Sequence, residues 1–398
     1  MNLFSFKKKS YLSFVFDIRD TSISVAATKF ENNKKPEIIY CQNFKIDYQE
    51  DIESKKYTTS MIRTLDKAIL TVRKNIIKIG FKGDIKKYSF FIGSPWSVSQ
   101  SKTIKFIKDK VFNVDNSFLR RIILNEEDKI EKEIENNSKG IDWKIIEDKI
   151  IQSKLNGYKT NKIYERKTKD IELDIFVSFV PQEILNKISS VVDNKTVKQQ
   201  TNSCVLSSFS FLRDLYTDKN DFLYIDIGEI ITDIYVVKDD VVFGIISFPF
   251  GEKNIIQSIS KASKISEYIV LSSINIKCHG KCDPKEKNRL EHLISIGMSK
   301  WFDKFNNTIL KICSENNIPQ NIFILPNTSL IKTFAERIKT VGDLELFKKF
   351  GLDVKVTIIE ESVFDDLIIN SKFFKKEPYI KMDLIFLNKN LINNIKNA

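Results

Sequence analysis

Residues 222–238, FLYIDIGEIITDIYVVK, carry the pattern that decides the fold. An apolar run ends in Asp226, a short turn containing Gly228 follows, and a β-branched run begins near Thr232. Two apolar runs separated by a short polar turn predict a β-hairpin. Residues 241–248 add a third β-rich run, so we expect a three-stranded meander.

The same pattern occurs near the start of the chain. Residues 11–30 read YLSFVFDIRDTSISVAATKF, in which an apolar run ends in Asp17 and a polar turn contains Thr21 and Ser22. Two similar strand–Asp–turn–strand segments in one chain suggest an internal duplication.

The remaining segments alternate between strand and helix signals. Alternation of this kind favours an α/β fold. We expect helices over 58–80, 181–193, 287–316 and from about 330 to 339, and strands over 88–92, 175–180, 321–325, 354–359 and 380–387.

Residues 106–170 differ from the rest in being dense in Lys, Glu, Asp and Asn. Residues 116–135 and 142–155 have helical spacing, and the sequence NSKG at 137–140 separates them. This stretch is typical of a small, polar subdomain inserted into a larger one.

Length and composition limit the class of protein. A chain of 398 residues with 42% hydrophobic residues can form two or three folded units. The net charge of +12 has two possible origins. It either reflects the compositional bias of an AT-rich genome or serves to attract an acidic membrane or nucleic acid. No helix-turn-helix, zinc-finger or RNA-binding motif supports a nucleic-acid partner. No apolar segment is long enough to cross a bilayer and the first residues do not form a secretory signal, so we expect a cytoplasmic protein.

The second hairpin has the chemistry of a phosphate site. Gly228 allows the backbone to approach an anion closely, and Asp226 could hold Mg²⁺ through water. Thr232 could contact phosphate or cap the turn. A plain hairpin explains the same residues, because Asp and Gly are common in turns.

The two hairpins together resemble the two phosphate loops of the actin-like ATPase superfamily. The opening LFSFKKKSYLSFVFDIRDTSISV, residues 3–25, resembles the start of the PilM family of type IV pilus assembly proteins. The same layout occurs in the FtsA family of cell division proteins. The resemblance implies an α/β, actin-like (ribonuclease H-like), two-lobed duplicated fold, with a nucleotide cleft and an inserted small α+β (SHS2) subdomain in the first lobe.

The resemblance also implies how the chain is divided. It places the first phosphate loop in 1–93, and the inserted subdomain in 94–170. Residues 171–221 return to the first lobe, 222–360 form the second lobe with the second phosphate loop, and 361–398 form a C-terminal segment.

The cofactor implied is ATP with Mg²⁺. Asp17 and Asp226 would hold the metal through water, and Gly251, in FPFGEKN, would match one glycine of the Gly-Gly pair that follows the third strand in the family. The residues implied to contact the nucleotide are Asp17, Thr21, Ser22, Asp226, Gly228, Thr232 and Gly251, together with Asn327 and Thr328 in the adenosine turn.

The sequence departs from the family pattern at several places. Arg19 stands where the first loop has Gly, and Pro326 with Asn327 replaces a Gly-Gly pair. The family's small-residue C-terminal helix is not recognisable in 375–398. No catalytic residue that positions an attacking water can be assigned. We therefore expect at most a weak ATPase, and either a nucleotide-binding scaffold or a pseudo-ATPase.

The function implied is a scaffold at the inner face of the cell membrane. Such proteins bind the cytoplasmic tail of an inner-membrane protein, here a PilN-like one, and self-association and peripheral membrane contact are possible. The alternatives are an FtsA-like division protein that links a filament to the membrane, and an active ATPase of the superfamily. Cys278 and Cys282 fit a polar loop better than a zinc site, which needs four ligands.

Overall fold

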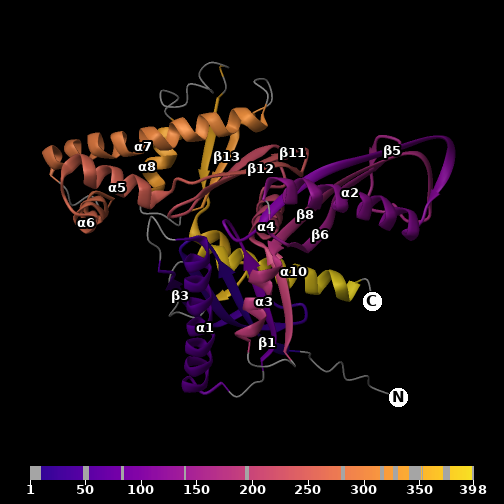
Figure 1. Ribbon diagram of the computed structural model, residues 1–398, viewed down its shortest axis with the longest axis horizontal. Coiled ribbons are helices and arrows are strands. Elements are labelled where there is room, and N and C mark those ends of the chain that lie inside the picture. Colours follow the sequence, from indigo (N-terminus) through magenta and orange to yellow (C-terminus); the bar gives the residue numbers. More distant parts are fainter. Residues whose placement is uncertain are drawn as a thin grey trace. The chain divides into compact units, whose positions relative to one another are not determined.

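The chain divides into two compact units in the computed structural model (Figure 1). The first unit comprises Met1–Leu215 and Phe364–Ala398, and the second comprises Tyr216–Val363. The structure describes residues 10–47, 53–81, 85–138, 140–192, 197–278, 283–313, 318–325, 330–339, 351, 353–370 and 377–396.

The first unit is built on a six-stranded sheet of order β15-β3-β2-β1-β4-β9. β1, β2 and β3 form an antiparallel meander, and β4 and β9 run parallel to β1. The strands are β1 (Ser10–Ile18), β2 (Ser22–Glu31), β3 (Glu37–Lys45), β4 (Ile85–Ile92), β9 (Lys198–Ser203) and β15 (Ile369–Asn370).

Helices cover both faces of this sheet. Arg73 on α1 hydrogen-bonds Tyr88 of β4, whereas Phe386 on α10 packs edge-on against Phe91. Tyr88 and Phe91 differ by an odd number of residues, so they point to opposite faces. The helices of the unit are α1 (Ser54–Lys78), α3 (Gln182–Ser190), α4 (Cys204–Leu215) and α10 (Pro378–Lys396).

A separate four-stranded antiparallel sheet, order β5-β8-β6-β7, carries one helix in the same unit (Figure 1). A core that includes Phe118, Ile130, Trp143 and Ile175 lies between sheet and helix. We call this part the inserted subdomain. Its elements are β5 (Val98–Val114), α2 (Asn116–Asn137), β6 (Trp143–Leu155), β7 (Tyr158–Lys159) and β8 (Arg166–Pro181).

The second unit is built on a five-stranded sheet of order β12-β11-β10-β13-β14. Its core contains Trp301, which is stacked on Phe305. Its strands are β10 (Phe222–Ile227), β11 (Thr232–Lys238), β12 (Val241–Phe248), β13 (Asn321–Ile324) and β14 (Lys355–Ile358). Its helices are α5 (Glu252–Ser263), α6 (Glu267–Cys278), α7 (Pro284–Ile312) and α8 (Ile331–Lys339), and the 3₁₀ turn η1 (Glu361–Phe364) follows β14.

The two sheets repeat one topology. In each, three antiparallel strands are followed by two strands parallel to the first, in the orders β3-β2-β1-β4-β9 and β12-β11-β10-β13-β14. This confirms the expectation of a duplicated α/β fold.

Two sequence-based expectations about secondary structure are wrong. Residues 142–155 were expected to be helical, but 143–155 form strand β6, because pairing with β8 along its length overrides the local spacing. Residues 380–387 were expected to form a strand, but they lie in helix α10. A short apolar run alone does not distinguish a buried strand from a buried helix.

β8 runs without interruption from Arg166 to Pro181. It therefore crosses residue 171, where the sequence places the end of the insertion. Within the described part of the chain, no helix is long and apolar enough to cross a membrane.

Candidate functional site

The turn of the first hairpin is held by its own polar groups. The Arg19 N–H donates to the Ser22 carbonyl (2.9 Å), and the Thr21 N–H donates to the Asp20 carboxylate (2.8 Å). The Thr21 hydroxyl oxygen is buried and has no hydrogen-bond partner within the described ranges, so it would suit a ligand atom.

Asp17 lies at the end of β1 and its carboxylate is paired with Arg19. Nε of Arg19 donates to Oδ1 at 2.8 Å and lies 3.2 Å from Oδ2. The thiol of Cys204, at the start of α4, lies 3.7 Å from Oδ2. Asp17 is only 1% exposed, so this ion pair is inside the protein.

Two aromatic residues hold Arg19 in place. The guanidinium lies over the ring of Tyr379 on α10, with its carbon 3.7 Å from the ring centre. The indole N–H of Trp96 donates to the Arg19 carbonyl (2.9 Å). Cation–π contact is strongest when it is desolvated, as it is here.

A second carboxyl group completes this cluster. Asp383 on α10 is fully buried, and it accepts a hydrogen bond from the Ser207 hydroxyl (2.7 Å). Burial, and then the negative charge of Asp17, raise the pKa of Asp383 well above its usual range. The raised pKa favours the uncharged form of Asp383 beside the Asp17 carboxylate.

In the second hairpin, the turn is packed under the start of α5. The N–H groups of Glu252 and Lys253 donate to the carbonyls of Gly228 (3.0 Å) and Glu229 (2.8 Å). A Cβ on Gly251 would lie 2.4 Å from the Gly228 oxygen. Gly251 is therefore required for this close approach, and the first N–H groups of α5 are used within the chain.

Thr232 is buried in the second unit. Its hydroxyl donates to the Phe250 carbonyl (2.7 Å) and accepts from the indole N–H of Trp301 (2.9 Å). Both hydrogen bonds fix the turn, so the geometry supports the capping interpretation of Thr232.

Asp226 lies at the end of β10, directly opposite Asp233 on β11. Both side chains are buried, and Asp233 accepts a hydrogen bond from Ser247. Ser22 lies half-buried at the start of β2. Asn327, Thr328 and Cys282 lie outside the described residues.

The surroundings of Asp17 do not fit a hydrated magnesium ion. Mg²⁺ is bound through one or two carboxylates and keeps several waters. The Asp17 carboxylate is buried and contacts the guanidinium of Arg19. Among the described residues, no group of three or more His, Cys, Asp and Glu side chains could hold a metal.

The sequence analysis did not identify Tyr379 and Asp383 as part of this cluster. A carboxylate and a tyrosine within the apolar run 378–387 are the available signal. These two residues could be assigned to the cluster only if the run were expected to be a helix, whereas the sequence favoured a strand.

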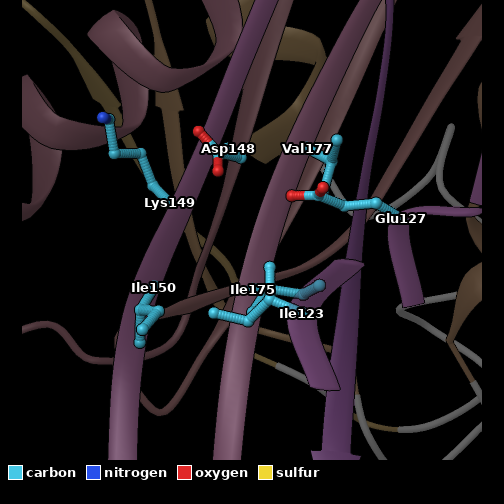
Figure 2. Close-up of a pocket in the computed structure, with 7 residues that line it drawn as sticks. All are labelled: Ile123, Glu127, Asp148, Lys149, Ile150, Ile175 and Val177. Carbon is cyan, nitrogen blue, oxygen red and sulfur yellow. The ribbon is translucent and has the colours of Figure 1, made fainter. Parts of the chain in front are cut away.

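A second candidate site is a pocket of about 260 Å³ in the inserted subdomain (Figure 2). The oxygens of Asp148 and Glu127 lie at one end and Ile123, Ile150 and Ile175 at the other, while Lys149 extends away from Glu127. Burial and the nearby Asp148 raise the pKa of Glu127. One Glu127 oxygen is buried without a hydrogen-bond partner within the described ranges. The pocket thus combines apolar walls with two carboxyl groups.

Comparisons with known proteins identify the fold. No family profile matches the sequence, and no curated protein matches it. Among solved structures, the chain is similar to one described as a PilM-PilN type IV pilus biogenesis complex, with 10% identity and a TM-score of 0.57, covering 96% of this chain and 97% of that one.

Two further similar structures have lower TM-scores. One is a protein of unknown function with an actin-like ATPase fold from Bacteroides thetaiotaomicron, at 9% identity and a TM-score of 0.43, covering 96% of this chain and 99% of the other. The other is the ethanolamine utilization protein EutJ from Carboxydothermus hydrogenoformans, also at 9% identity and a TM-score of 0.43, covering 96% and 89%.

The chain therefore has the duplicated α/β fold of the actin-like proteins. Within that class, its fold is like that of PilM, over nearly the whole of both chains.

Proposed function

We propose that this protein is a PilM-like scaffold of type IV pilus assembly, or of a related inner-membrane machine. In this proposal it lies at the cytoplasmic face of the membrane and binds the cytoplasmic tail of a PilN-like protein. The observation that carries the proposal is the likeness in fold to the PilM-PilN structure, which extends over 96% of this chain. Self-association and peripheral membrane contact would be secondary properties of such a scaffold.

The pocket of the inserted subdomain supports a tail of defined chemistry. A volume of about 260 Å³ is below the usual range of cofactor sites and suits one or two side chains. The carboxyl groups of Glu127 and Asp148 would attract a lysine or arginine, and the isoleucines would contact an apolar neighbour. We therefore expect a tail segment that carries basic and apolar residues together.

Nucleotide has a limited place in this proposal. The second loop, with Asp226 and Gly228, could still contact phosphate, whereas Asp17 is already paired with Arg19. Binding of ATP would then tune the scaffold without efficient hydrolysis.

The test is binding of the N-terminal cytoplasmic segment of the PilN-like protein, labelled and titrated with the full chain by fluorescence anisotropy. We expect a dissociation constant in the micromolar range. The absence of binding at tens of micromolar would reject the scaffold proposal.

Variants locate the contact. Glu127→Gln with Asp148→Asn should weaken binding at least tenfold, because both carboxyl groups that face the basic residue are lost. Glu135→Gln, an exposed change on the same helix, is the matched control and should leave binding unchanged. Equal binding by all variants would support the scaffold proposal and would show that the tail does not bind in the pocket.

A further inference from the structure

We propose that Arg19 is a built-in counter-ion that stands in for a divalent cation beside Asp17, so that the first hairpin holds no Mg²⁺. The guanidinium nitrogen lies 2.8 Å from one Asp17 oxygen and 3.2 Å from the other. A positive charge of the chain itself therefore neutralises the carboxylate that a metal would need.

Other side chains also occupy the space around the Asp17 carboxylate. Tyr379 covers one face of the guanidinium at 3.7 Å, and Asp383 lies on the same helix α10. The Cys204 thiol lies 3.7 Å from the second Asp17 oxygen. A cation with its water shell would have to displace these side chains.

The cluster already contains cations that belong to the chain. Arg19 and Lys381 are buried, as are the carboxyl groups of Asp17 and Asp20. Glu377 is half-buried, and burial raises the pKa of both Glu377 and Asp383. Glu377 also accepts a hydrogen bond from Ser24 (2.8 Å). An added divalent cation beside Asp17 would lie next to the buried guanidinium of Arg19, and like charges at this separation repel each other.

Arg19 could in principle turn outward and bind a phosphate instead. That movement would break the ion pair with Asp17 and the contact with Tyr379. It would take the paired guanidinium away from the Asp17 carboxylate, which lies near a second buried carboxyl group, Asp383. The geometry therefore favours Arg19 as a fixed internal group.

The consequence is a division between the two hairpins. Any metal-dependent step in nucleotide binding must use the second hairpin, and the first has kept its backbone while its site is occupied by the chain. Mg²⁺ should thus have no effect that passes through Asp17.

The first experiment removes the guanidinium of Arg19 by substitution and adds Mg²⁺. The full chain with Arg19→Gly is unfolded by heat with and without millimolar Mg²⁺, beside the wild type and the double variant Asp17→Asn/Arg19→Gly. We expect Mg²⁺ to raise the unfolding temperature of Arg19→Gly alone by several degrees. A folded Arg19→Gly protein that does not respond differently from the wild type would overturn the proposal.

The second experiment keeps Arg19 and does not depend on the stability of that variant. Mn²⁺ binding to the Asp226→Ala protein is followed by electron paramagnetic resonance, with Asp17→Asn/Asp226→Ala as the control. We expect no bound Mn²⁺ in either protein at micromolar concentrations. Bound Mn²⁺ that disappears when Asp17 is also replaced would show that Arg19 does not occupy the cation's place.

Discussion

The hairpins β1–β2 and β10–β11 have the same backbone arrangement, but the side chains in their turns make different contacts. Each has a buried strand that ends in Asp-Ile, a tight turn and an antiparallel return strand. In the first hairpin, the guanidinium of Arg19 in the turn pairs with the carboxylate of Asp17. In the second, the turn places Gly228 under Gly251, and Asp226 faces Asp233.

This difference shows that two hairpins with the same backbone pairing can carry different side-chain contacts. The backbone of a tight hairpin is fixed by ladder hydrogen bonds and apolar packing, and in the first hairpin both are present with Arg19 in the turn. Its side chain then determines what the loop can bind. Comparison of the same change in both hairpins can therefore separate fold from function.

The largest effect is expected at Arg19. Arg19→Met leaves the buried carboxylate of Asp17 without its counter-ion, which should lower the free energy of unfolding of the first unit by about 3–5 kcal/mol. Adding Asp17→Asn should restore a large part of the loss, because the unpaired charge is removed. Urea unfolding of both variants measures the coupling, and strictly additive losses would contradict a direct ion pair.

The next effect concerns the glycine of the second hairpin. In Gly251→Ala the new Cβ meets backbone atoms at 2.4 Å and 2.5 Å, so the turn must move and stability should fall by about 3 kcal/mol. Gly244→Ala is the matched control, since its Cβ meets only the Ile312 side chain, at 2.6 Å. That side chain can rotate away, and a loss of about 1 kcal/mol is expected by urea unfolding. Equal losses would show that the Gly228–Gly251 contact is not rigid.

The duplicated fold was accessible from the sequence, because both strand–Asp–turn–strand segments depend on local patterning. The meander at 222–248 and the helix at 58–80 were confirmed for the same reason. Strand β6 was not, because its partner β8 lies outside the window in which helical spacing is read.

The first candidate site could be predicted only in part. Asp17 and Arg19 are two residues apart, and Arg19 was recognised as a departure from the family pattern. Tyr379 and Asp383 are more than 350 residues away in sequence, and α10 brings them to Asp17 by packing on the sheet. No local sequence pattern predicts that contact, so the cluster of Arg19 and Asp17 with residues of α10 could not be inferred from the sequence.

Stability should also depend on pH through a residue that supports the surroundings of the first hairpin. Glu147 of β6 accepts hydrogen bonds from the N–H (3.1 Å) and hydroxyl (2.9 Å) of Ser203, which precedes α4. Burial raises the pKa of Glu147 to about 7. A raised pKa contributes stability that is complete at acid pH, below the unfolded value, and is lost as the pH rises to about 7.

We therefore expect the unfolding free energy of the wild type to fall by about 2 kcal/mol more than that of Glu147→Gln between pH 5 and 7.5. Glutamine keeps an acceptor for Ser203 and cannot ionise. Urea unfolding across this range gives the two slopes, and Glu135→Gln is the control that should retain the wild-type slope. Parallel slopes for wild type and Glu147→Gln would show that Glu147 does not titrate in this window.

The smallest effect is expected on nucleotide binding, where the hairpins should differ directly. Asp226→Ala should weaken ATP binding measured by calorimetry about tenfold, or about 1.4 kcal/mol, because a carboxylate that could orient a hydrated cation is lost. Asp17→Asn should leave ATP affinity within twofold, since Asp17 already pairs with Arg19. If Asp17→Asn weakened binding as much as Asp226→Ala, both hairpins would contact the nucleotide and the contrast between them would fail. If the wild type bound no ATP at millimolar concentration, the second hairpin too would serve only as part of the scaffold.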